Sequence, residues 1–269
     1  MHPNWIGVLA AALSLAAFPP AYRLAARLDA RGRRLFAAGA SLAALPGLSF
    51  AAHYAHVLPE TGWYYQLRSL TGTELLVVLV GVAGGAVAAL LPRRWLAPAL
   101  AGIVALSIAP FAKPLIGPLP DGVLRDEWNG AVCLQSTQST CGAASVATLL
   151  RANGVAAREA DLAREAHSYQ GGTEAWYLAR AIRARDCRVR FPFAHGFDDD
   201  VALPAMAGVR MRTYGHFIPI LARNADGYVI GDPLRGEERL TREALLARYD
   251  FTGFYMVVDD CGRGPRTAF

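Results

Sequence analysis

Long apolar runs in residues 1–118 constrain the fold of this chain more than any other feature. Four stretches, at residues 5–22, 35–58, 74–91 and 95–112, are rich in Ala, Leu and Val, and almost all charges of this half fall between them. A helix needs about 20 apolar residues to cross a bilayer. We therefore predict an N-terminal all-α transmembrane domain of about four helices, with the lipid bilayer as a partner.

The first apolar stretch could instead be a cleaved signal or an interfacial segment. The four residues before it contain no lysine or arginine, whereas a secretory signal peptide begins with a basic region. This favours a retained helix, which Pro19 and Pro20 could kink or shorten.

Positive charge is distributed unequally among the connectors. Residues 23–34 contain five arginines and residues 92–94 contain two, whereas residues 59–73 contain only Arg68. Arginine and lysine stay preferentially on the cytoplasmic side. We expect the first and third connectors inside and the second outside, so four spans place the C-terminal domain on the periplasmic side of a bacterial inner membrane. A miscount of one span would reverse the side of that domain.

Residues 120–269 have the composition of a globular domain and follow a link rich in proline and glycine. Helices are predicted at residues 141–151, 158–167, 174–185 and 242–249, and strands at residues 189–193, 205–212, 216–223, 228–231 and 254–258. Helices followed by antiparallel strands indicate an α+β domain.

Cys141 begins an apolar helix, where free backbone N–H groups and the helix dipole favour an anion. A thiol attacks as the thiolate, so this position suits a nucleophile, and Gly142 is expected to leave space for a substrate backbone. His216 alone among the six histidines begins a strongly apolar strand, where its ring could act as a base. A turn at residues 224–227 would bring Asp232 to the same end of the sheet, where it could orient that ring.

An oxyanion also needs a hydrogen-bond donor. Gln135, six residues before the cysteine, is the leading candidate and Gln138 is its rival. Each of these residues alone has an ordinary structural interpretation, but the set in this order predicts a catalytic site of Cys141, His216, Asp232 and Gln135.

The same residues resemble the C39 cysteine peptidases, a family of papain-like fold that includes bacteriocin-processing domains fused to ABC exporters. The resemblance covers about residues 134–258. It rests on Gln135 before Cys141-Gly-Ala-Ala, on the strand His216-Phe-Ile-Pro-Ile, and on Asp232-Pro after the next strand. It implies Cys141 as nucleophile, His216 as base, Asp232 as its orienting acid and Gln135 in the oxyanion hole. Thr140 stands where the family often has aspartate, and without a P-loop in the sequence we expect no ABC ATPase domain.

Other partners are not expected. The net charge of +5 comes largely from the arginine-rich connectors, and no basic stripe with interleaved aromatics predicts nucleic-acid binding. No cysteine or histidine spacing fits a zinc site, so neither a metal nor another cofactor is predicted. Cys187 and Cys261 form a candidate disulfide, with free buried thiols, including Cys133, as the alternative.

The leading hypothesis is a membrane-anchored cysteine peptidase that hydrolyses peptide bonds of a secreted or membrane-associated protein or peptide. A thiol acyltransferase, such as a transpeptidase, would use the same triad. A silent docking domain that binds substrate for a partner export system would be expected to lack the nucleophile, and Cys141 weighs against it. A transporter with a regulatory domain is disfavoured because the spans have no charged residue in their interior.

Overall fold

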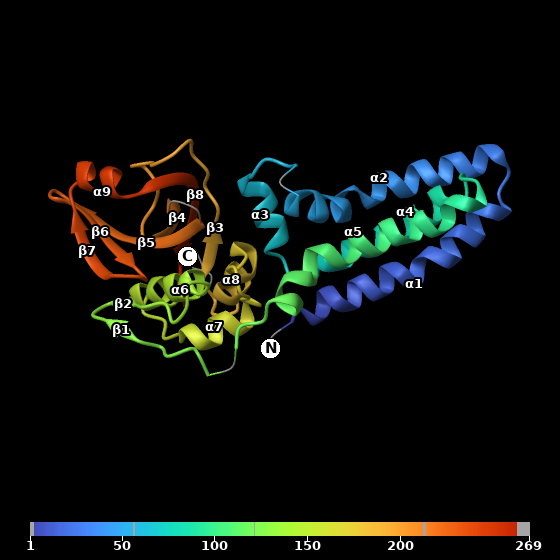
Figure 1. The fold of residues 1–269 in the computed structure, drawn as a ribbon. Coiled ribbons are helices and arrows are strands. Elements are labelled where there is room, and N and C mark those ends of the chain that lie inside the picture. The colour runs from blue at the N-terminus through green and yellow to red at the C-terminus, as the bar shows by residue number, and fades with distance from the viewer. Residues whose placement is uncertain (1–2, 56, 121, 212–213, 263–269) are drawn as a thin grey trace, which may run out of the picture. The chain divides into compact units, whose positions relative to one another are not determined.

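The computed structural model describes residues 3–55, 57–120, 122–211 and 214–262 (Figure 1). Contacts between Cα atoms divide the chain into two compact units, each described here by itself. The helical unit consists of Pro3–Glu60 and Thr71–Ile116, and the α+β unit contains Thr61–Leu70 and the chain from Gly117 onward. The predicted order of an all-α region followed by an α+β domain is confirmed.

The helical unit contains α1 (Trp5–Arg27), α2 (Ala30–Tyr54), η1 (Thr73–Val77), α4 (Val78–Ala88), η2 (Arg93–Trp95) and α5 (Leu96–Ile116). Three of the described helices are long and apolar enough to cross a membrane, and a fourth candidate combines the short helix α3 (Gly62–Arg68) with η1 and α4. The first helix runs through Pro19 and Pro20 to Arg27, so these prolines do not shorten it.

Glycines let α4 pack closely in this unit. A Cβ atom at Gly81 would lie 1.8 Å from the carbonyl oxygen of Ser14, and one at Gly85 would lie 2.3 Å from that of Phe18. The backbones of α1 and α4 are therefore in direct contact, as small residues allow within membranes. The hydroxyls of Ser14 and Ser107 lie 2.8 Å apart and join α1 to α5.

The α+β unit contains a six-stranded antiparallel sheet in the order β3-β8-β4-β5-β6-β7. Its strands are β3 (Arg188–Arg190), β4 (Ala205–Met211), β5 (Tyr214–Asn224), β6 (Gly227–Asp232), β7 (Gly236–Leu240) and β8 (Asp250–Asp259), and β1 (Trp128–Asn129) pairs with β2 (Val132–Cys133) apart from it. Its longer helices are α6 (Cys141–Ala152), α7 (Glu159–Glu165), α8 (Ala175–Arg183) and α9 (Arg242–Arg248). Strands β1, β2 and the edge strand β7 are additions to the predicted set.

The short helix α3 (Gly62–Arg68) belongs to the α+β unit, although the chain reaches it between two apolar stretches. The ring of Tyr65 lies 5.3–5.5 Å, between centroids, from the rings of Trp176, Phe191, Phe193 and Phe254. This division differs from two contiguous domains at 1–118 and 120–269, because Tyr64 and Tyr65 of the second connector are buried against aromatic residues of the C-terminal domain.

Candidate active site

Cys141 is the first residue of α6, and its neighbours hold this end of the helix in place. The helix is buried from Cys141 to Leu150. The Ser145 hydroxyl donates a hydrogen bond of 3.0 Å to the carbonyl oxygen of Phe217, which fixes α6 against β5 next to His216. The cysteine is therefore presented at the start of a buried helix, where the free N–H groups of the first turn favour a negative charge.

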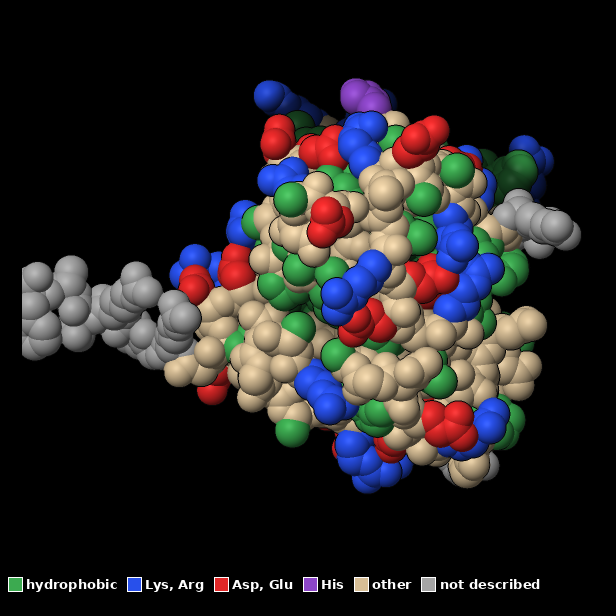
Figure 2. All heavy atoms as spheres, turned by 90° about the vertical axis from the view of Figure 1, so that its left-hand side faces the viewer, with side chains coloured by type: hydrophobic (Ala, Val, Ile, Leu, Met, Phe, Trp, Pro, Cys, Tyr) green, Lys and Arg blue, Asp and Glu red, His purple; other side chains and the backbone are tan. Residues whose placement is uncertain are grey.

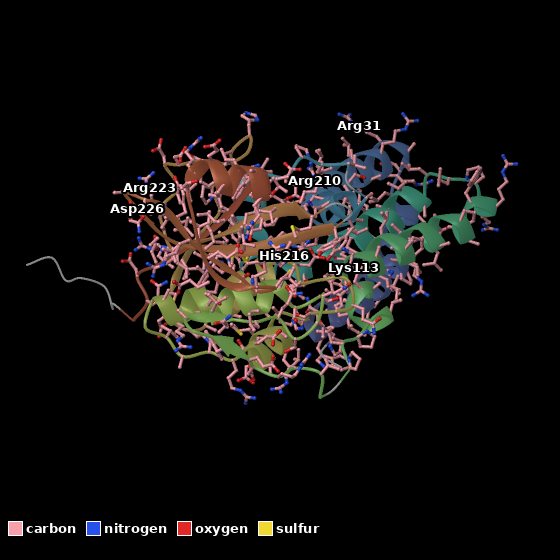
Figure 3. All side chains as sticks on the ribbon, turned by 60° about the vertical axis from the view of Figure 1, so that its left-hand side comes forward. Arg31, Lys113, Arg210, His216, Arg223 and Asp226 are labelled. Carbon is pink, nitrogen blue, oxygen red and sulfur yellow. A yellow bond between two sulfur atoms is a disulfide. The ribbon has the colours of Figure 1, made fainter. Side chains whose placement is uncertain are left out.

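The hairpin of β5 and β6 brings His216 and Asp232 together. Asn224 pairs with Gly227 at the turn, and His216 and Asp232 lie at the opposite end of the paired strands. His216 Nε2 lies 2.9 Å from Oδ1 of Asp232, and the two side chains are 1% and 0% exposed. Figure 3 shows His216 inside the unit, while Arg223 and Asp226 project outward at the hairpin tip. The pairing expected from the turn is present.

Cys141 also affects the titration of His216. Burial of the imidazole opposes its protonation, but hydrogen bonds with Asp232 and Cys141 outweigh burial and raise the pKa of His216 to about 9. Because Nε2 is bonded to Asp232, Nδ1 is the ring nitrogen available to the thiol. Burial also opposes the charge on Asp232, but hydrogen bonds from His216 and the Leu234 N–H hold its pKa below the ordinary value. This arrangement favours an imidazolium next to a carboxylate.

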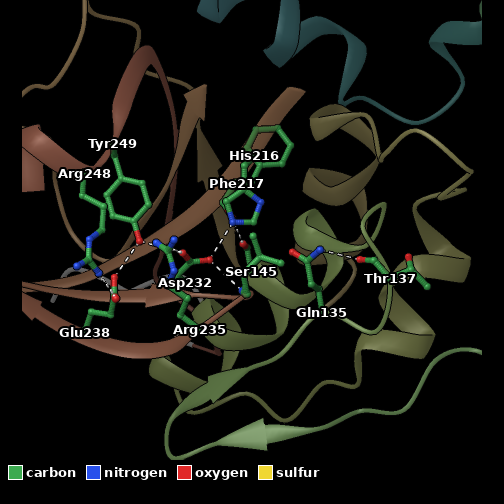
Figure 4. A network of polar contacts seen from close by, with 11 residues as sticks. Gln135, Thr137, Ser145, His216, Phe217, Asp232, Arg235, Glu238, Arg248 and Tyr249 are labelled. Carbon is green, nitrogen blue, oxygen red and sulfur yellow. Dashed lines mark hydrogen bonds and ion pairs between the residues drawn. The ribbon is translucent and has the colours of Figure 1, made fainter. Parts of the chain in front are cut away.

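Gln135 is held in place by hydrogen bonds of both its backbone and its side chain. Its backbone N–H donates to the carbonyl oxygen of Pro233, 2.9 Å away, directly after Asp232. Its side-chain Nε2 donates to the carbonyl oxygen of Thr137 at 2.7 Å (Figure 4). An amide nitrogen carries two hydrogens, so one N–H of Gln135 is left for another acceptor. The rival Gln138 is exposed.

Gly142 does not leave an open space. A Cβ atom there would lie 2.8 Å from Leu178, 3.5 Å from Phe217 and 3.6 Å from Thr173. The absence of a side chain lets these residues pack against α6, so the expectation that this glycine makes room for a substrate backbone is wrong.

Tyr249 is a polar neighbour of the pair that the sequence did not indicate. Its hydroxyl lies 2.9 Å from Oδ2 of Asp232 and 2.9 Å from Oε2 of Glu238 (Figure 4). Glu238 in turn pairs with Arg248, and Arg235 lies 3.6 Å from Asp232. No local pattern marks this tyrosine, because it ends α9 in a stretch that reads as an ordinary amphipathic helix.

The remaining cysteines have other environments. Cys187 and Cys261 form a disulfide, as one of the two sequence alternatives expected, and Cys133 is a free, buried thiol. Burial, with the nearby charge of Glu159, raises the pKa of Cys133 to about 12, which makes it a poor nucleophile. Among the described residues, no three His, Cys, Asp or Glu side chains are grouped so as to hold a metal ion.

An α+β domain that presents a cysteine at a helix start to a bonded histidine–aspartate pair has the architecture of a thiol peptidase domain. The model of the Peptidase C39 family matches residues 130–261. This part of the chain is a Peptidase C39 domain, preceded by apolar helices.

Proteins of known sequence match about half of this chain. An uncharacterized protein of Methanothermobacter marburgensis is 29% identical over 130 residues, which are 46% of this chain and 85% of that protein. FapD of Pseudomonas fluorescens, a probable functional amyloid protease, is 26% identical over 168 residues, which are 57% of this chain and 71% of that protein.

Two solved structures resemble the domain more distantly. The peptidase domain of Streptococcus ComA, a bifunctional ABC transporter of a quorum-sensing pathway, gives a TM-score of 0.40 at 19% identity, over 46% of this chain and 94% of that chain. A double-glycine-motif protease from an AMS/PCAT transporter, in complex with the leader peptide, gives a TM-score of 0.40 at 17% identity. The match covers 53% of this chain and 96% of that chain.

Proposed function

We propose that this protein is a membrane-anchored cysteine peptidase that hydrolyses peptide bonds with Cys141 as nucleophile, His216 as base, Asp232 as orienting acid and Gln135 as oxyanion donor. The observation that carries the proposal is the buried bond of 2.9 Å between His216 Nε2 and Asp232 Oδ1, in a domain that places Cys141 at the start of the buried helix α6. Membership of residues 130–261 in the Peptidase C39 family supports the same chemistry.

The reaction begins when His216 Nδ1 takes the proton of the Cys141 thiol. The thiolate sulfur attacks the scissile carbonyl carbon, and the oxyanion that develops accepts hydrogen bonds from the free N–H of Gln135 and the backbone N–H of Cys141. Collapse of this intermediate breaks the C–N bond, and the imidazolium returns its proton to the leaving amine. Water, deprotonated by His216, then attacks the thioester and releases the acid, with the thiol restored.

Asp232 keeps the ring of His216 in the orientation that these reaction steps require. With its Nε2–H donated to Asp232, the neutral ring presents the lone pair of Nδ1 to the thiol. The buried carboxylate also stabilises the imidazolium that forms in each half-reaction.

The substrate class follows from the relatives and from the anchor. FapD is a probable functional amyloid protease, and a double-glycine-motif protease of the comparison binds a leader peptide. By analogy, we propose a secreted or membrane-associated protein or peptide as substrate. A membrane anchor raises the effective concentration of such a substrate near the site, and a partner export system could deliver it.

The domain is proposed to lie outside the cytoplasm. The arginine-rich connector after α1 favours the inside, so the end of α2 and the following α3 reach the outside if α2 spans the bilayer. Because α3 packs within the α+β unit, that unit shares its side. The proposed side of the α+β unit therefore follows from the orientation of α2, whatever the number of later spans. The Cys187–Cys261 disulfide is consistent with an oxidising compartment.

The direct test of the chemistry uses the full chain, purified in detergent, with a diverse peptide mixture. Wild-type protein should produce new peptide termini, and Cys141→Ala should produce none. Transfer of the acyl group from Cys141 to an added amine, in place of water, would favour an acyltransferase instead. Binding of peptides by both proteins, with neither cleavage nor acyl transfer, would favour a docking domain.

A further inference from the structure

Tyr249 extends the candidate triad on the side away from the cysteine. Its hydroxyl lies 2.9 Å from Oδ2 of Asp232, whose other oxygen, Oδ1, accepts from His216 and from the Leu234 N–H. We propose that Tyr249 is a positioning residue, which holds Asp232 in the orientation that directs Oδ1 at His216. The inference rests on the proposed function for its catalytic meaning, but its structural basis stands apart from it.

The hydroxyl of Tyr249 has two carboxylate neighbours and a single proton. Glu238, the second neighbour, is 17% exposed and is paired with Arg248, whereas Asp232 is fully buried. A buried carboxylate oxygen without a donor is costly, and the guanidinium of Arg235 is 3.6 Å away, beyond hydrogen-bond distance. The proton of Tyr249 is therefore needed most at Oδ2 of Asp232.

The environment of Tyr249 keeps its hydroxyl protonated, so that it can donate a hydrogen bond. The residue is 2% exposed, and its burial, together with the charge of Asp232, raises its pKa far above the working range of a protein. The hydroxyl is consequently protonated whenever the site is folded. The Glu238–Arg248 pair is partly exposed and so lies on the side of the phenol toward solvent. Figure 2 shows one face of the α+β unit, on which basic and acidic side chains are interspersed.

The groups that face the pair come from four elements. Cys141 lies on α6, Tyr249 and Arg248 lie at the end of α9, Glu238 lies on β7, and Arg235 lies in the turn before β7. Removal of the Tyr249 hydroxyl leaves Oδ2 of Asp232 without its hydrogen-bond donor, so the carboxylate is held only through Oδ1 and its orientation is less restricted. His216 then loses its fixed orientation.

The experiment compares Tyr249→Phe with Tyr255→Phe in the full chain in detergent. Tyr255 is also buried and also uses its hydroxyl, but on Gly196 and Asp198, so it controls for the loss of a buried phenol. We expect Tyr249→Phe to lower the rate of Cys141 alkylation by iodoacetamide at pH 7 about tenfold, the size of one hydrogen bond to a charged group. Tyr255→Phe should change it less than twofold.

Histidine nitrogen NMR adds a readout that needs neither a substrate nor a reactive thiol. With His216 assigned through a His216→Gln variant, its Nε2 resonance should move in Tyr249→Phe and stay in place in Tyr255→Phe. If Tyr249→Phe does not fold, 3-fluorotyrosine at position 249 keeps the shape and makes the phenol a stronger donor, and the resonance should still move. An unchanged Nε2 resonance with either substitution would overturn the proposal. A wild-type protein without a reactive Cys141 would instead count against the proposed function.

Discussion

His216 Nε2 lies 2.9 Å from Asp232 Oδ1, with both side chains withdrawn from water. A buried carboxylate is expensive unless it is paired and hydrogen-bonded. Asp232 meets that requirement with bonds from His216, the Leu234 N–H and Tyr249. The pair is therefore a buried, hydrogen-bonded polar cluster inside the domain.

Replacement of Asp232 by Asn should change the titration of His216. In the wild type, hydrogen bonds with Asp232 and Cys141 outweigh burial and raise the pKa of His216 to about 9. In Asp232→Asn the carboxylate is lost and burial remains, so the pKa of His216 should fall. Peptidase activity should fall at least about 100-fold, because the imidazolium is no longer stabilised. Nitrogen NMR of labelled histidine measures the pKa.

The same pair makes stability depend on pH. A raised histidine pKa stabilises the fold fully below the unfolded value near 6.5, and this contribution is lost as pH rises through about 9. The free energy of unfolding of wild-type protein should therefore fall by about 1–3 kcal/mol between pH 6 and pH 10. Asp232→Asn should show a flatter profile, and an equally steep one would contradict the assigned cause.

Gln135→Ala tests the oxyanion donor, with Gln138→Ala as its matched control. Gln135 is anchored to Pro233 and Thr137, whereas Gln138 is exposed. Loss of one such donor costs about 100- to 1000-fold in kcat, with little change in KM. We expect this loss for Gln135→Ala and less than a twofold change for Gln138→Ala. Equal effects of the two substitutions would remove Gln135 from the mechanism.

Tyr65→Ala tests the attachment of α3 to the α+β unit. Tyr65 is 7% exposed and packs among four aromatic rings, whereas Trp63 on the same helix is 69% exposed. Truncation of a buried aromatic side chain costs about 3–5 kcal/mol, so Tyr65→Ala should lower the unfolding temperature clearly. Trp63→Ala, measured in parallel, should change stability by about 0.5 kcal/mol. Similar shifts for both would contradict the docking of α3.

Cysteine labelling in intact cells tests the side of the membrane. In a Cys141→Ala background, new cysteines at Trp63 and Asp200 should react with a membrane-impermeant maleimide, because α3 and the domain are proposed to share the outer side. A cysteine at Arg31, in the arginine-rich connector, should react only after the membrane is permeabilised. Labelling at Arg31 without labelling at Asp200 would place the domain in the cytoplasm.

Local sequence patterns predicted most of this fold. The apolar stretches located α1, α2, the region of α4 and α5, and the turn signal at residues 224–227 paired β5 with β6. That hairpin is local in sequence, so the meeting of His216 and Asp232 could be inferred from residue spacing alone.

The features that sequence did not indicate depend on contacts between distant segments. Strand β7 reads Gly-Glu-Glu-Arg-Leu, a charged pattern typical of an exposed edge rather than of a core strand. Tyr249 reaches Asp232 only after α9 packs on the sheet. The docking of α3 joins Tyr65 to Phe254, which are 189 positions apart. No periodicity within one segment can report such pairings.

The most direct test of the central claim compares membranes from cells that carry wild-type protein and Cys141→Ala, by quantitative N-terminal proteomics. We expect one or a few new N-termini, on secreted or membrane-associated proteins, that appear with wild-type protein and disappear with Cys141→Ala while the uncleaved precursors accumulate. Matching sets of N-termini in the two membranes, with both proteins present in equal amount, would contradict a peptidase that acts through Cys141.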